Sequence, residues 1–118
     1  MLAAEEMASG EEEGSQNPAW ELYEVENLVL NPAGTQGRRF LILSAAIEVD
    51  PDRTLSILQG LEPRLRDGIL RALGSWGVEE LVDANRRTEV EEVVRAVVRE
   101  VTGGQPVGRV YFSQFVLQ

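Results

Sequence analysis

The last eleven residues, GRVYFSQFVLQ (108–118), decide how the rest of the chain must fold. Most of their side chains are large and apolar, and chain ends fray unless something holds them. Because apolar side chains are costly to leave in water, we expect a strand over about 107–117, paired inside a sheet almost to the last residue. The alternation places Val110, Phe112 and Val116 on one face and Tyr111, Phe115 and Leu117 on the other. This pattern predicts an interior strand.

Two segments earlier in the chain predict partners for that strand. The stretch LYEVENLVL (22–30) alternates loosely, with Tyr23, Val25, Asn27 and Val29 on one side. The stretch RRFLILSAAIEV (38–49) is apolar on both faces, which predicts a central strand covered on both sides. The loop between them, NPAGTQG (31–37), is rich in turn residues, so an antiparallel hairpin is expected.

The middle of the chain changes to a helical period. Asp50 is expected to be the N-cap of a helix with Pro51 at its first position. Pro63 should kink or split this helix near Glu62, and Gly74 with Gly77 should end it. A short helical segment follows within VEELVDA (78–84).

In the segment TEVEEVVRAVVREVTGG (88–104), the residue types and their spacing predict different secondary structures. Valine favours strands, but the six valines fall at the spacing of a helix stripe: 90, 93, 94, 97, 98 and 101. We therefore expect a helix, with Thr88 and Glu91 as a capping box and Gly103-Gly104 as the stop.

Together these elements predict an α+β fold of order ββααβ, an antiparallel sheet of about three strands packed against two or three helices. The 118 residues suffice for one domain, which we place at 20–118. Residues 1–26 hold eight glutamates and no arginine, so residues 1–19 are expected to be a flexible acidic linker. That segment has neither an apolar run near the length of a membrane span nor the pattern of a signal peptide.

Composition excludes most reactive chemistry. The chain has no His, no Cys and no Lys, which removes the usual general base, thiolates and Schiff-base lysines. Residues 27–118 carry twelve acids and eleven arginines without a basic stripe, which argues against nucleic acid. Glu48, Asp50 and Asp52 could gather a divalent cation, although helix capping explains the two aspartates more simply. We expect no cofactor, no metal and no enzymatic activity.

Read in order, three segments resemble the flagellar basal body-associated FliL family. They are LYEVENLVLNPAGTQGRRFLILSAAIEVD, LEPRLRDGILRALGSWGVEEL and VEEVVRAVVREVTGGQPVGRVYFSQFVLQ. The elements that carry the resemblance are Asn31-Pro32 with Gly34, Arg39-Phe40-Leu41, Glu48, and the final Val110 to Gln118. The resemblance spans about 22–118.

The resemblance implies a bacterial inner-membrane protein with one N-terminal transmembrane helix and a periplasmic domain similar in fold to stomatin and other SPFH domains. Family members are not enzymes. They associate with flagellar stator proteins of the MotA/MotB type, assemble as rings when membrane-tethered, and support torque, swimming and swarming. The membrane helix is absent from this chain. We expect a soluble fragment that begins after it, with 1–19 as a membrane-proximal linker, and the alternative is a family member that has lost its anchor.

A ring needs two different patches that meet. From charge alone, we expect a self-association or partner surface on the helix faces that bear Arg64, Arg71, Arg95 and Arg99, opposite the acids of the first strand. The alternative is a small-ligand-binding or carboxylate-dependent catalytic domain, which would need a buried Glu48 facing a cavity. A structural domain with another partner is a third reading.

Overall fold

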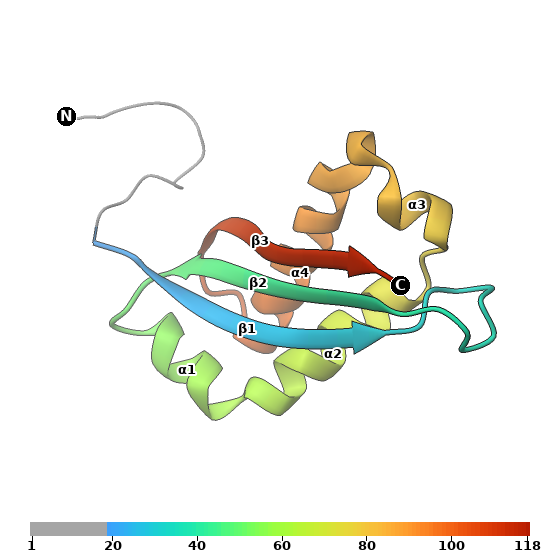
Figure 1. Ribbon diagram of the computed structural model, residues 1–118. Helices are drawn as coiled ribbons and strands as arrows, with labels where there is room; N and C mark the ends of the chain where they lie inside the picture. Colours follow the sequence, from blue (N-terminus) through green and yellow to red (C-terminus); the bar gives the residue numbers. More distant parts are fainter. Residues whose placement is uncertain (1–18) are drawn as a thin grey trace.

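A computed structural model describes residues 19–118 and has a three-stranded antiparallel sheet with four α-helices (Figure 1). In chain order the elements are β1 (Glu21–Leu30), β2 (Leu41–Val49), α1 (Thr54–Gly60), α2 (Glu62–Gly74), α3 (Val78–Val82), the 3-10 turn η1 (Ala84–Arg86), α4 (Arg87–Val101) and β3 (Val107–Leu117). This confirms the predicted fold class. The acidic linker expected at 1–19 lies almost wholly outside the described residues.

The strands lie in the order β1-β2-β3, so β2 is the central strand, as expected. Both pairings are antiparallel, with Leu41 opposite Leu30 on one side and opposite Leu117 on the other. The expectation that the last strand is interior is wrong, because β3 forms an edge of the sheet. Its inward-facing apolar residues, Val110, Phe112, Phe115 and Leu117, pack against the core under the helical layer, where α4 is the main neighbour of β3. This removes the need for a second neighbouring strand on that face.

The helices cover only one face of the sheet. Leu41, Leu43, Ala45, Ile47 and Val49 of β2 point into a core that they share with Leu65 and Ile69 of α2 and Val94 and Val98 of α4. The expectation that β2 is covered on both sides is therefore wrong. On its other face Ser44 and Ala46 are buried because they are small and lie between the side chains of two flanking strands.

Irregular positions in both edge strands change which residues share a face. In β1 the register shifts between Val25 and Leu28, where Asn27 adopts a φ of 58°. Leu28 and Leu30 consequently join Tyr23 and Val25 in the core, contrary to the simple alternation. In β3 a shift at Ser113 brings two rings to the inner face, where Phe112 and Phe115 meet edge-to-face at 5.4 Å. Tyr111 and Val116 point outward.

Pro63 divides the first helical stretch as predicted. One helix ends at Gly60 and the next begins at Glu62, with the proline in the first turn of α2. Asp50 is not the N-cap of α1, which begins only at Thr54. Its Oδ1 instead accepts the Asp52 N–H at 2.9 Å, because Pro51 starts a turn before the helix.

The valine-rich segment is the helix α4, with Val90, Val94, Val97 and Val98 buried. The predicted capping box at Thr88 is wrong, because η1 leads directly into the helix one residue earlier. A capping interaction of this type occurs instead at the start of α3, where the backbone N–H of Gly77 donates to Glu80 Oε1 at 2.9 Å. Gly103 and Gly104 have positive φ and end α4 as expected.

The last residue is held in place. Phe40 and Gln118 exchange two backbone hydrogen bonds, of 3.0 and 2.8 Å. The β1–β2 loop is in turn fixed to the end of α2, since the Ala33 N–H donates to the Trp76 carbonyl at 2.9 Å. The loop and the end of β3 therefore lie together, at the end of the sheet opposite the start of β1 (Figure 1).

Candidate interaction surfaces

The uncovered face of the sheet is unusually apolar. Five large side chains on this open face are 42–50% exposed: Leu22, Val29, Phe40, Tyr111 and Val116. Register places Val29 and Val116 on either side of Ile42, and Phe40 follows in the same alternation. Val29, Ile42, Val116 and Phe40 adjoin one another, and contiguous apolar groups of this kind often mark interaction sites.

A polar row crosses the middle of the open face. The Asn27 N–H donates to Ser44 Oγ at 3.0 Å, and Ser44 Oγ donates to Gln114 Oε1 at 3.0 Å. From the flank, the Arg66 guanidinium donates to the carbonyls of Glu26 and Asn27 at 3.0 and 3.2 Å. Ser44 therefore ties all three strands together.

Glu48 lies half-buried at the other end of the open face. Its Oε1 accepts the Arg109 N–H at 3.2 Å, and it fits beside Gly108, where a Cβ would come within 2.4 Å of that oxygen. Burial raises the pKa of the Glu48 carboxyl, while the hydrogen bond from Arg109 and its positive charge act in the opposite direction. The carboxylate is thus engaged by the neighbouring strand and faces the open side of the sheet.

The raised pKa of Glu48 predicts that replacing its carboxylate by a neutral side chain stabilises the protein, by an amount that depends on pH. The folded state favours the protonated form of Glu48. The contribution of this side chain to stability is therefore present at acid pH and is lost as the pH rises through its folded-state pKa. Glu48→Gln keeps an acceptor for the Arg109 N–H and should stabilise the protein at neutral pH. Urea titrations across pH should show this advantage shrinking on acidification.

The exposed Glu24 lies on the same face and supplies the matched control for that experiment. Glu24→Gln removes one negative charge without changing the Gly108 site. A Glu48→Gln variant that is less stable than the parent at neutral pH would contradict the proposed balance of burial against hydrogen bonding.

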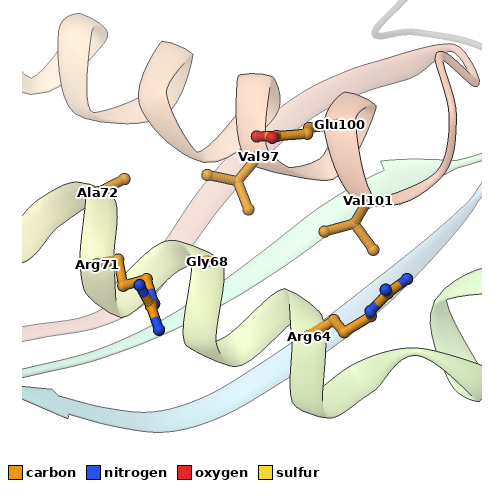
Figure 2. Close-up of a pocket in the computed structure, with 7 residues that line it drawn as sticks. All are labelled: Arg64, Gly68, Arg71, Ala72, Val97, Glu100 and Val101. Carbon is orange, nitrogen blue, oxygen red and sulfur yellow. The ribbon is translucent and has the colours of Figure 1, made fainter.

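A groove of about 580 Å³ lies between α2 and α4 on the helical layer (Figure 2). Its lining is Arg64, Gly68, Arg71 and Ala72 of α2 with Val97, Glu100 and Val101 of α4. The helices approach closely at Gly68, where an added Cβ would lie 2.7 Å from Val97 Cγ1. Arg71 is paired with Asp67 at 2.8 Å. Glu48 does not line this groove.

Arg95 and Arg99 lie on a different side of α4 from the groove. Arg95 bonds to Glu92 at 2.7 Å and to the Val107 carbonyl at 3.0 Å, so this side faces the beginning of β3. Arg99 approaches the same Glu92 at 3.9 Å. The four arginines expected to form one surface therefore belong to two: the groove pair, Arg64 and Arg71, and the flank pair, Arg95 and Arg99.

The described residues offer no metal site and no membrane span. Within 19–118, no three acidic side chains gather as metal ligands, so the Glu48, Asp50 and Asp52 hypothesis is not supported. Nor is any helix in this part of the chain long and apolar enough to cross a membrane.

The model of the flagellar basal body-associated protein FliL matches residues 22–118, from the second residue of β1 to the last residue paired with Phe40. The chain belongs to the FliL family. A comparison with curated proteins finds no match. FliL membership makes this a flagellar basal body-associated protein with a part in motility, and it agrees with the resemblance found in the sequence.

Proposed function

We propose that residues 20–118 form the periplasmic domain of a non-enzymatic FliL protein that associates with stator units of the MotA/MotB type. In this proposal the protein is held at the inner membrane, with residues 1–19 as its linker, and has an SPFH-like domain. It forms a ring scaffold at the basal body and supports torque, swimming and swarming.

The observation that carries the proposal is the open face of the sheet. A domain that lacks His, Cys and Lys but exposes five large apolar side chains on one face is suited to binding a protein partner. The Glu48 carboxylate is half-buried and bonded to the Arg109 N–H, and it does not face the groove. This arrangement favours the scaffold over a carboxylate-dependent catalyst.

Ring closure requires a heterologous contact between two different surfaces. The exposed acids of β1, Glu21, Glu24 and Glu26, lie along one edge of the sheet, while the flank pair lies beside β3 at the other. We assign the contact between neighbouring copies to these two surfaces. Tethering to a membrane raises the effective concentration enough for a weak contact of this kind to form a ring.

The test uses the full chain displayed on lipid vesicles through an N-terminal tag. Binding of the periplasmic part of the same organism's MotB-type subunit and ring formation by electron microscopy are the two measurements. Val29→Glu with Val116→Glu should abolish stator binding, and Arg99→Glu should abolish rings. Arg64→Glu, a single charge reversal on the groove, is the matched charge control.

A folded, displayed domain that neither binds the stator subunit nor forms rings would leave only the family membership and would refute the proposed role. Rings that persist in the Arg99→Glu variant but disappear with the groove variant would place the contact on the other pair of arginines.

A further inference from the structure

One end of the open face forms an apolar patch that no described residue covers. We call Val29, Phe40, Ile42 and Val116 the distal patch, since it lies at the end of the sheet opposite Glu21. Val29 and Val116 flank Ile42 directly in the register, and three of the four side chains are 42–50% exposed. Patches of adjoining aliphatic and aromatic groups are rarely left bare in soluble domains.

The distal patch has a basic rim. Arg38 and Arg39 directly precede Phe40, and both are exposed. Arg39 Nε donates to the Gln118 main-chain oxygen at 3.4 Å, but no carboxylate side chain within 19–118 pairs with either guanidinium. The acids of the open face, Glu24 and Glu48, lie toward its other end. A ligand that suits this patch therefore combines apolar side chains with carboxylates.

The chain contains a segment of that composition outside the described residues. Residues 1–7, MLAAEEM, place Glu5 and Glu6 between the large apolar side chains of Met1, Leu2 and Met7, with no basic side chain. Two adjacent carboxylates match two adjacent arginines in number and in sign.

The connecting residues are long enough to bring this segment to the patch. The described chain enters β1 at the end of the sheet opposite the patch, and the ten residues of β1 span about 33 Å. The eleven residues 8–18 have a maximum reach of about 36 Å. Residues 1–7 can therefore reach the distal patch of their own molecule if residues 8–18 follow the open face.

We propose that residues 1–7 dock on the distal patch of the same chain, with Glu5 and Glu6 on Arg38 and Arg39 and the apolar side chains on Val29, Ile42 and Val116. A partner that uses the open face must then displace this segment. The inference does not depend on the identity of that partner or on binding to the stator.

The absence of cysteine makes a specific label simple to introduce. A nitroxide on Ala4→Cys in the full chain should broaden the NMR signals of Val29, Ile42 and Val116. It should leave those of Val97 and Val101, on the opposite helical layer, at full intensity. The broadening should not change on dilution, and it should weaken at high salt because the arginine contacts are exposed.

Arg38→Glu with Arg39→Glu should abolish the broadening, while Arg64→Glu with Arg71→Glu should preserve it as the matched control. Since these arginines are exposed, the folded spectrum should survive in both variants. Equal broadening of the sheet and helical faces would overturn the proposal, as would broadening that persists after reversal of Arg38 and Arg39. Broadening seen only between a labelled chain and an unlabelled one would assign the patch to a second copy instead.

Discussion

Replacing Gly68 by valine should lower the free energy of unfolding by about 1–3 kcal/mol, the usual cost of overpacking a close contact. An added Cβ at this position would lie 2.7 Å from Val97 Cγ1, closer than real Cβ contacts allow. The two additional methyl groups of valine enlarge the clash. Since α2 and α4 form the helical layer that covers the core, they cannot separate without exposing Ile69 and Val98.

Urea denaturation measures this loss, and the chain offers both a rescue and a control. Val97→Ala removes the methyl group that obstructs the new side chain, so the double variant should recover part of the loss in a mutant cycle. Gly74→Val lies in the same helix with nothing within 4 Å of its added Cβ and should change stability little. Equal destabilisation by the two glycine substitutions would show that the close approach at Val97 is not the cause.

The helices, and the residues that divide or end them, are the part of the fold most readable from sequence, although the predicted N-caps at Asp50 and Thr88 are wrong. In α4 the valines recur with a helical period over four turns, and burial of one stripe outweighs their intrinsic preference for strands. Pro63 breaks the preceding helical stretch because it lacks an N–H and restricts the residue before it. These effects are local, so one sequence suffices to detect them.

The faces of the strands were predicted less well, for a physical reason. Side chains alternate with a period of two, so one irregular residue reverses every side chain beyond it. Asn27 has this effect in β1 and Ser113 in β3, and neither has a sequence signal as strong as a proline. The alternation placed Val29 with Tyr23 and Val25, whereas the structure exposes it on the opposite face.

The interaction surfaces were also predicted less well, in part because the faces of the strands were wrong. Charge in the sequence directed attention to four arginines on helices, which the structure divides between the groove and the flank of α4. The apolar open face cannot be recognised from an alternation that places Val29 with Tyr23 and Val25 and treats the strand that carries Val116 as interior. Only the register of the three strands brings these two valines together around Ile42.

The position of Val29 depends on the register shift of β1 around Asn27. Ser44 stabilises this irregular segment by accepting a hydrogen bond from the Asn27 N–H. Ser44→Ala should cost about 1–3 kcal/mol, because it leaves the Asn27 N–H without its acceptor. Gln114 loses its donor in the same step. Ser44→Thr, which keeps a hydroxyl, should retain part of this stability, and Ser113→Ala, at an exposed serine of β3, should change it by less than about 0.5 kcal/mol.

Hydrogen exchange locates the effect within the sheet. In Ser44→Ala the amide of Asn27 should exchange much faster than in the parent protein. The amides of α4 should exchange faster only by the amount that the global free energy of unfolding falls. Arg66 holds the same segment from the flank through the Glu26 and Asn27 carbonyls. If Ser44→Ala leaves both stability and Asn27 exchange unchanged, Arg66 alone fixes the segment. In that case Arg66→Ala, rather than the serine substitution, should disturb β1 and with it the placement of Val29 on the open face.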